Sequence, residues 1–386
     1  MTVVKLGEIC DLVNGKAFKP SDWSASGTPI IRIQNLNGSE KPFNYWSGTL
    51  DRQVRVNAGD VLLAWSGTPG TSFGVHIWDR MPAILNQHIF RVDLDRKRIG
   101  RRWFKYAVNS RLDQLIAKAH GGVGLQHVTR GMVDELEIPL PPLDEQRRIA
   151  AILDEADALR RKRKRAIELL DSLRGSIFRQ AFVGDSPKDW PKCSVESLSR
   201  DIRTGPFGSQ LLHSEFVDEG IAVLGIDNVV ANEFQWRERR YVTAEKYAKL
   251  RRYTVSPGDV LITIMGTCGR CAIVPDDVPI AINTKHLCCI TLENGRCLPE
   301  FMHAAFLQHP DVLQQLGVQS KGAVMPGLNM GIIKSLLIPL PPIDLQRKFA
   351  EMASSIKRML DSLREAETGS NILFSSLQHR AFSGQL

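Results

Sequence analysis

The chain has 386 residues, 43% of them hydrophobic, with 50 Lys and Arg against 42 Asp and Glu, hence a formal charge of +8 at pH 7. That length allows two or three domains with their own cores, and no apolar stretch approaches the roughly 18 residues of a membrane span. The start has no apolar leader, and the seven cysteines lack framework spacing, so we expect a cytoplasmic protein with reduced thiols. The basic balance is compatible with a polyanionic partner without proving one.

Strands and helices are predicted to share the first part of the chain. Short apolar runs bounded by turn residues, at 29–36, 61–65 and 83–92, are typical of strands. The segment 101–119 has helical periodicity, as has 299–316 further along. Prolines at 139, 141 and 142 exclude a helix just before Leu143, and the long stretch that follows has no proline and only Gly175. A long helix is predicted to start there.

This long helix carries a stripe of apolar or small residues spaced three and four apart, which is the pattern of a coiled-coil seam. Arg163 is its one exception. The stripe comprises Ile149, Ile152, Ala156, Leu159, Ala166, Leu170, Leu173 and Ile177, and 200 positions on Phe349, Met352, Ile356, Met359, Leu363, Ala366, Leu373 and Leu377.

The whole pattern occurs twice. The tract at 138–150, Ile-Pro-Leu-Pro-Pro-Leu-Asp-Glu-Gln-Arg-Arg-Ile-Ala, returns at 338–350, and Gly59-Asp60-Val61-Leu62 returns at 258–261. A repeat at half the chain length indicates two copies of one unit. We expect an α+β fold with target domains at 1–142 and 185–342, each a small sheet or barrel plus helices, followed by spacer helices at 143–184 and 343–386.

The two striped helices are predicted to pair as an antiparallel coiled coil with pseudo-twofold symmetry, because each would otherwise leave its stripe in water. The alternative is that each helix packs only on its own domain.

Taken together, a globular unit, a Pro-Leu-Pro-Pro-Leu-x-Glu-Gln-x-x-Ile-Ala tract and a long helix, all repeated, resemble the specificity (S) subunit of type I restriction-modification systems. The resemblance covers essentially the whole chain, and Leu345 departs from the Glu of the tract. It implies two target-recognition domains, each binding one half of a split DNA sequence, and two spacer helices that dock methyltransferase subunits. Since the two copies differ outside the shared tracts, an asymmetric target is expected.

The sequence shows no catalytic motif. It lacks the Asn/Asp-Pro-Pro-aromatic tract of adenine methyltransferases, a P-loop, a Pro-Asp nuclease motif with its acidic-x-Lys, and the Gly-x-Ser-x-Gly of hydrolases. We therefore expect a chain that is not an enzyme and that leaves catalysis to its partners.

Polar and cationic side chains in loops after strands are the usual contacts to base edges. The predicted DNA-binding residues of the first copy are Arg32, Gln34, Trp65, Ser66, Thr68, Asn86, Gln87, His88, Gln126 and His127. Those of the second copy are Asp227, Thr267, Arg270, Asn283, Lys285, His286 and Lys321. Asn35 and Asn228, identical in both copies, are instead expected to serve a shared turn. For any single residue, turn capping or a solvated role is the alternative.

Two cationic groups lie on the helices. The run 160–165, Arg-Arg-Lys-Arg-Lys-Arg, has no basic counterpart at 360–365, and it is either a solvated face or a contact to DNA phosphates. At the helix starts, either docking of the methyltransferase or fixing of the turn is expected of Gln146, Arg147, Arg148, Gln346, Arg347 and Lys348.

Cys268 and Cys271, with His286 and the pair Cys288 and Cys289, have the spacing of a zinc site. The first copy has no such ligands at its equivalent turn, which favours buried thiols. We expect no cofactor on this chain, with S-adenosylmethionine, ATP and Mg²⁺ on partner subunits. The expected partners are double-stranded DNA, two methyltransferase (M) subunits and two restriction/translocase (R) subunits. The alternatives are the specificity subunit of a type IIB-like enzyme and a duplicated protein-binding scaffold without DNA affinity.

Overall fold

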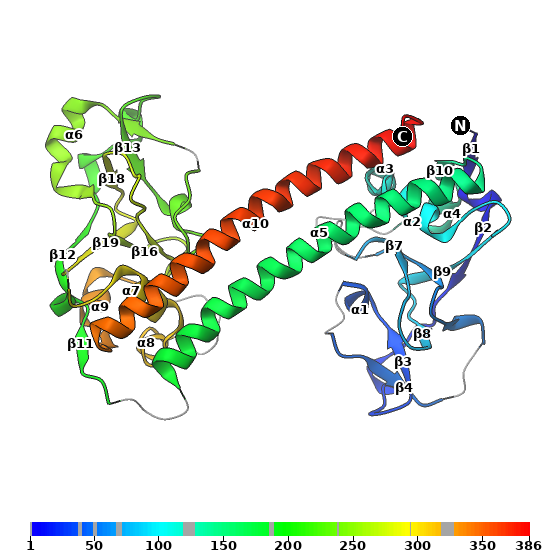
Figure 1. The fold of residues 1–386 in the computed structure, drawn as a ribbon, viewed down its shortest axis with the longest axis horizontal. Helices are drawn as coiled ribbons and strands as arrows, with labels where there is room; N and C mark the ends of the chain where they lie inside the picture. The colour runs from blue at the N-terminus through cyan, green and yellow to red at the C-terminus, as the bar shows by residue number, and fades with distance from the viewer. Residues whose placement is uncertain are drawn as a thin grey trace. The chain divides into compact units, whose positions relative to one another are not determined.

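The structure, a computed structural model, describes residues 2–37, 41–48, 52–66, 72–118, 128–184, 189–237, 239–293, 295–317 and 328–386. The chain forms two compact units, with residues 1–164 and 365–386 in unit 1 and residues 165–364 in unit 2 (Figure 1). Two long helices, α5 (Leu143–Phe178) and α10 (Ile343–Ser383), contribute to both units. None of the described helices is both long and apolar enough to cross a membrane.

Unit 1 contains two four-stranded sheets and a separate strand pair. The first sheet has the order β2-β9-β6-β7 and is antiparallel; the second has the order β4-β3-β8-β5, in which β3 and β8 run parallel; and β1 pairs with β10. Its elements besides the long helices are β1 (Val3–Lys5), β2 (Cys10–Asn14), β3 (Thr28–Ile31), α1 (Ile33–Asn37), β4 (Asn44–Trp46), β5 (Arg55–Val56), β6 (Val61–Ala64), β7 (Gly74–Ile77), β8 (Ala83–Leu85), β9 (Ile89–Leu94), α2 (Arg101–Asn109), α3 (Leu112–Lys118), α4 (Arg130–Asp134) and β10 (Glu137–Pro139).

Unit 2 repeats this topology strand for strand, with sheets β12-β19-β16-β17 and β14-β13-β18-β15 and the pair β11-β20. The α+β prediction and the duplication are therefore confirmed. Its elements are β11 (Lys192–Ser194), β12 (Ser199–Thr204), β13 (Ile221–Leu224), β14 (Tyr241–Val242), α6 (Ala244–Leu250), β15 (Thr254–Val255), β16 (Val260–Thr263), β17 (Cys271–Ile273), β18 (Ala281–Asn283), β19 (Leu287–Leu292), α7 (Pro299–Gln308), α8 (Pro310–Gln315), α9 (Met330–Ser335) and β20 (Leu337–Pro339).

Several predicted element boundaries are wrong. The predicted strand 83–92 is two strands, β8 and β9, which lie in different sheets and are joined by a turn at 86–88. The predicted strand 29–36 ends at Ile31 and is followed by α1. Each predicted helix after the sheets is two helices: α2 and α3 in unit 1, α7 and α8 in unit 2. Pro310 explains the second break, because its ring fixes φ and removes a donor, so it begins a new helix.

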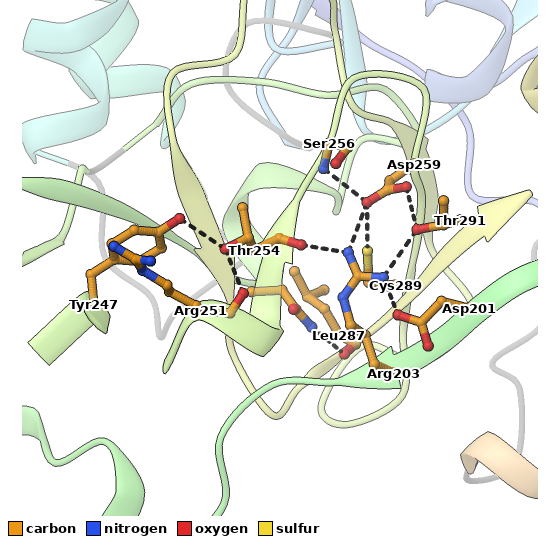
Figure 2. A network of polar contacts seen from close by, with 11 residues as sticks. Asp201, Arg203, Tyr247, Arg251, Thr254, Ser256, Asp259, Leu287, Cys289 and Thr291 are labelled. Atoms are coloured by element: carbon orange, nitrogen blue, oxygen red, sulfur yellow. Dashed lines mark hydrogen bonds and ion pairs between the residues drawn. The ribbon is translucent and has the colours of Figure 1, made fainter. Parts of the chain in front are cut away.

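An arginine joins the two sheets of each unit. In unit 2, Arg203 of β12 donates to the Thr254 carbonyl of β15 and pairs with Asp259 at 3.0 Å (Figure 2). In unit 1, Arg91 of β9 donates to the Arg55 carbonyl of β5 at 2.8 Å. The two arginines make the same connection between sheets, but Arg91 lies on β9 and Arg203 on β12, the counterpart of the neighbouring strand β2. They therefore do not align when the two copies of the sequence are compared.

The repeated Gly-Asp pair forms the turn before β6 and β16. Asp60 and Asp259 each accept a hydrogen bond from the backbone N–H three residues earlier, at 2.8 and 2.9 Å. Gly59 and Gly258 have φ of +93° and +80°, which non-glycine residues rarely adopt. This requirement accounts for the motif in both copies.

The Pro-Pro tract anchors the start of each long helix through a buried glutamine. Gln146 accepts from the Gly100 N–H and donates to the carbonyls of Arg98 and Pro141, all at 2.8–2.9 Å. Gln346 makes the matching three bonds, to Leu298, Arg296 and Pro341. Because both N–H groups and the oxygen of each amide are engaged with backbone groups, these bonds fix the helix against the start of α2 or α7.

The two long helices run antiparallel in each unit. In unit 1, Arg160 donates to Asn371 at 2.9 Å, and Arg163 donates to the Ala366 carbonyl at 2.8 Å, so rising numbers on α5 meet falling numbers on α10. In unit 2, the rings of Phe178 and Phe349 lie 5.6 Å apart and Asp171 lies 3.9 Å from Arg364, so again rising numbers on α5 meet falling numbers on α10. The predicted antiparallel pair is confirmed within both units.

The predicted stripe is only partly the packed seam. Leu153, Leu360 and Phe374 are buried although they lie outside it. A straight α-helix drifts by about 20° per heptad relative to a 3.5-residue repeat, and each helix must also cover its own domain, so the packed face rotates along its length. Five predicted seam residues are exposed instead: Leu159, Leu173, Met352, Met359 and Leu373.

Candidate nucleic-acid interface

Five predicted DNA-binding residues come together in unit 1. Arg32 and Gln34 follow β3, and Asn86, Gln87 and His88 form the turn between β8 and β9, so both segments leave the parallel pair β3 and β8 at the same edge. They line one open hollow of about 430 Å³. The sequence therefore placed these five side chains in one surface, although their role in binding DNA stays a prediction.

The hollow has aromatic walls that sequence reasoning missed. Phe18 and Trp23 line it together with Pro20. The Arg32 guanidinium lies 5.1 Å from the Trp23 ring centroid, and Lys16 lies 4.4 Å from that of Trp46. Aromatic rings beside cations are a usual feature of protein surfaces that bind nucleic acids. The segment from Lys16 to Trp23 has little strand periodicity. Its mixture of Lys, Phe and Trp was the feature from which a nucleic-acid contact could have been predicted.

A buried asparagine stabilises the loop after β3 that carries Arg32 and Gln34. Asn35 accepts from the Arg32 N–H at 3.0 Å, and its amide donates to the carbonyls of Lys41 and Pro42. Asn228 repeats the arrangement, accepting from the Gly225 N–H at 2.9 Å and donating to the Gln235 carbonyl. Both side chains are buried, and the predicted shared turn is confirmed.

The turns at 86–88 and 284–286, here named the crossover turns, carry the chain from one sheet to the other. Asn86 donates its N–H to the Ile31 carbonyl, and Thr284 donates to the Leu224 carbonyl. A Cβ at Gly15 would collide with the carbonyls of Leu85 and Asn86, and one at Gly205 with those of Asn283 and Thr284, so only glycine allows this approach. Both turns therefore have the same framework.

This register decides which residues of the two turns are equivalent. Asn283 ends β18 opposite Leu224, as Leu85 ends β8 opposite Ile31, so the counterpart of Asn86 is Thr284. Asn283 is completely buried and donates to the Leu287 carbonyl at 3.0 Å. In this structure it stabilises the sheet and does not reach a surface where DNA could bind.

Unit 2 has a more cationic surface at the equivalent place. Lys285 and His286 are half-buried, and Asp227 pairs with Arg240 at 2.8 Å. Burial, with the nearby charges of Lys285 and Arg240, lowers the pKa of His286 below its usual value of 6.5. Arg239 stacks at 5.0 Å on Trp236. The Trp236-Arg237 and Arg239-Arg240 pairs were also missed, although basic residues beside an aromatic were visible in the sequence.

The other predicted contacts are scattered. Trp65 is half-buried, with its ring centroid 5.5 Å from that of His88, whereas Ser66 is buried. Thr267 is exposed and Arg270 half-buried, beside β17 in unit 2. Thr68, Gln126, His127 and Lys321 lie outside the described residues.

No zinc site is formed by the cysteines in the described part of the chain. Cys271, Cys288 and Cys289 are buried in sheet cores, and burial raises the pKa of the Cys288 thiol to about 12. Across the described ranges, no group of three or more His, Cys, Asp or Glu is arranged to hold a metal ion.

The predicted docking residues separate into two kinds. Gln146 and Gln346 are buried and anchor the helix starts. The four cations are exposed: Arg147, Arg148, Arg347 and Lys348. Three of these cations pair with carboxylates one turn earlier on the same helix, Arg147 with Asp144 at 2.7 Å. Docking by this group stays a prediction.

The basic run on α5 does not point outward all round. Arg160 and Arg163 face α10 in unit 1, where Arg160 also stacks at 4.4 Å on Phe374. Arg161, Lys162, Lys164 and Arg165 are exposed. Only these four remain as candidate phosphate contacts.

Exposed apolar residues recur at equivalent helix positions. Leu159 is 41% exposed and its counterpart Met359 is 56% exposed; Leu173 is 45% and its counterpart Leu373 is 51% exposed. Thus Leu159 and Leu373 lie in unit 1, and Met359 and Leu173 in unit 2. Exposed apolar residues that gather into a patch mark interaction surfaces, so these positions are candidates for docking.

Comparison with known proteins identifies the family. The family model described as "Type I restriction modification DNA specificity domain" matches residues 1–169 and 223–368. The chain belongs to this family. The specificity subunits of type I systems recognise DNA and are not catalytic. The chain is such a specificity subunit.

Individual relatives agree over most of the chain. The EcoBI specificity subunit of Escherichia coli is 24% identical, with 99% of this chain and 85% of the relative aligned. The MjaVIII specificity subunit of Methanocaldococcus jannaschii is 23% identical, over 94% and 87%. Among solved structures, the S subunit from M. genitalium has a TM-score of 0.64 at 17% identity, covering 99% of this chain and 96% of that one. A type I restriction-modification structure that addresses complex assembly has a TM-score of 0.51 at 18% identity, covering 100% and 98%.

Proposed function

We propose that the chain recognises an asymmetric, bipartite DNA sequence, with unit 1 binding one half-site and unit 2 the other. The observation that carries this is the contrast between the two crossover turns. Their backbones are held alike, yet the exposed Gln87 of unit 1 is replaced by the half-buried cation Lys285 in unit 2, and the half-buried Asn86 by the buried Thr284. Different hydrogen-bonding groups on one framework are suited to different base edges.

The variable residues of the neighbouring loop support the same division. Gln34, which donates to the Pro42 carbonyl at 3.2 Å, is replaced by Asp227, which is paired with Arg240. An amide can donate and accept, whereas a carboxylate only accepts. In our proposal the remaining predicted contacts, including Trp65, Ser66, Thr267 and Arg270, flank these readers.

Catalysis belongs to partner subunits in this proposal. Two M subunits would bring S-adenosylmethionine and methylate adenine in each half-site, and two R subunits would bring ATP and Mg²⁺ and cleave unmodified DNA, all in the cytoplasm. The matched apolar pairs support two equivalent docking surfaces for M subunits: Leu159 with Leu373, and Met359 with Leu173. Their recurrence in both repeats suits two copies of one partner.

A binding experiment tests the proposal. The full chain, co-purified with its methyltransferase partner, is titrated with a duplex carrying the target and with a scrambled duplex of equal length at several salt concentrations. We expect preference for the target and an association constant that falls steeply with salt, by a log–log slope of about −0.9 per phosphate contact. Equal, salt-insensitive or undetectable binding of both duplexes would contradict it and favour a protein-binding scaffold.

A further inference from the structure

Unit 2 has an open pocket of about 330 Å³, lined by residues of α5, α7, α10 and the end of β17. Its apolar wall includes Phe234 and Phe349, and its polar wall includes Glu233 and His303. That volume lies at the lower end of the range of small-molecule sites. None of its lining residues belongs to a crossover turn or to the predicted docking residues, so neither DNA binding nor docking accounts for it.

The pocket is present in unit 2 because small residues stand where unit 1 has large ones. The glutamine anchors align α2 with α7 and the start of α5 with that of α10. By this alignment Ala304 takes the place of Tyr106, and Ala353 takes the place of Leu153. Tyr106 and Leu153 are buried in unit 1, where Tyr106 also donates to Asp154 at 2.7 Å. The equivalent space of unit 1 is thus filled by side chains of its own.

The charges that line the pocket favour a cation. Arg174 is neutralised by Glu233, which lies 3.0 Å away. Within the described part of the chain, Asp276 and Glu300 form no ion pair, and Lys357 is the remaining cation of the lining and is exposed. Three carboxylates against two cations leave one net negative charge.

His303 supplies a hydrogen-bond acceptor to the same pocket. Its Nε2 lies 2.9 Å from the Asn232 carbonyl oxygen and 3.0 Å from that of Cys271. A ring nitrogen between two carbonyl oxygens carries the proton. Burial lowers the pKa of His303 below its usual value of 6.5, so the ring is neutral and Nδ1 is an unprotonated acceptor. A ligand that donates N–H groups suits this nitrogen.

We propose that unit 2 binds a small organic cation in this pocket, an amine whose apolar body packs on Phe234 and Phe349. The ammonium group would lie toward Glu300 and donate to Nδ1 of His303, since a cation is attracted by carboxylates and by the faces of aromatic rings. This binding site goes beyond the recognition of DNA, and it belongs to one of the two repeats.

The test uses the full chain, co-purified with its methyltransferase partner, and phenethylamine as the probe. Phenethyl alcohol and phenylpropionate, which have the same ring, are the neutral and anionic analogues. We expect calorimetry to give a Kd on the order of 1 mM for the amine, as suits a ligand of this size. The two analogues should bind at least about 10-fold more weakly, because they lose the attraction between opposite charges.

Variants that fill the pocket locate the binding. Ala353→Leu and Ala304→Tyr introduce the residues that unit 1 has at these positions, and each should abolish amine binding while DNA affinity is unchanged. Glu300→Gln should weaken amine binding about 5-fold, the effect of one partly exposed ion pair. Asp277→Asn removes the same charge at an exposed residue outside the lining and should leave amine binding unchanged. Thermal unfolding of each variant without the amine shows that the fold is kept.

Three outcomes would overturn the inference: no binding of the amine by the wild-type complex, equal affinities for the amine and its two analogues, or amine binding that persists in both pocket-filling variants. None of them bears on the preference for a target duplex, which tests the proposed function separately.

Discussion

Asp259 is 1% exposed, and its carboxylate accepts hydrogen bonds from Ser256, Thr291 and Arg203. Arg203→Ala would remove the cationic partner and leave the charge buried, which typically costs about 3 kcal/mol or more. We expect the free energy of unfolding, measured by denaturant titration, to fall by about 3 kcal/mol. Arg200→Ala, at an exposed arginine of the same strand, is the control, and an equal loss in both variants would contradict the role of Arg203.

Gln34 lines the unit 1 hollow. Gln34→Ala should relax recognition of one half-site by roughly 1–3 kcal/mol of discrimination, because its amide is lost from the base-facing surface. The methylated motif of cells expressing the variant measures this. Gln114→Ala, at an exposed glutamine of α3, should leave the motif unchanged; a motif unaltered by Gln34→Ala would remove this residue from the readers.

At the residue scale, polar loop ends after strands were predictable, because strand ends that share an edge bring their loops together. Phe18 and Trp23 were not, since they lie in an irregular segment without periodicity. Asn283 was chosen as a polar residue near a strand end, but it is the last residue of its strand, as Leu85 is in unit 1, and its side chain is buried. Sequence alone does not fix that register.

At the scale of elements, the Pro-Pro tract and its buried glutamine form one joint between domain and helix. Gln346→Ala would leave the Leu298 N–H and two carbonyls without partners. Each unsatisfied buried group costs about 1–3 kcal/mol, so we expect a loss of about 3 kcal/mol in unfolding free energy. Lys348→Ala, two residues on and exposed, should be nearly neutral, and a comparable loss there would speak against the joint.

The exposed apolar helix positions should affect assembly without affecting folding. Leu173→Lys, or Met359→Lys in the same unit, should reduce co-purification of the methyltransferase subunit at unchanged thermal stability. Ser172→Lys adds the same charge about 100° round the helix and serves as control. If Leu173→Lys assembles as the wild type does, this face of α5 is not a docking surface.

The long helices themselves were predictable from prolines, length and periodicity, and their antiparallel pairing followed from two unpaired stripes. The individual seam residues were not, because packing on the domains rotates the seam away from a strict heptad. Leu159, Leu173, Met352, Met359 and Leu373 are the residues that this rotation leaves exposed.

For the whole molecule, the internal repeat was the most informative property, since it predicted two units of one topology. Comparison of the two copies separates the framework from the variable surface. The sheets, the Gly-Asp turns and the glutamines at the helix starts are the same in both copies, whereas the crossover turns differ except at the histidine. Two domains with one framework and two surfaces are what recognition of an asymmetric bipartite sequence requires.

The most direct test of that claim is a map of methylated bases in the source genome before and after deletion of this gene. We predict the loss of a single bipartite adenine-methylated motif with two different halves, restored by the wild-type gene. An unchanged set of methylated motifs, in cells that express the chain and an intact methyltransferase partner, would contradict the account.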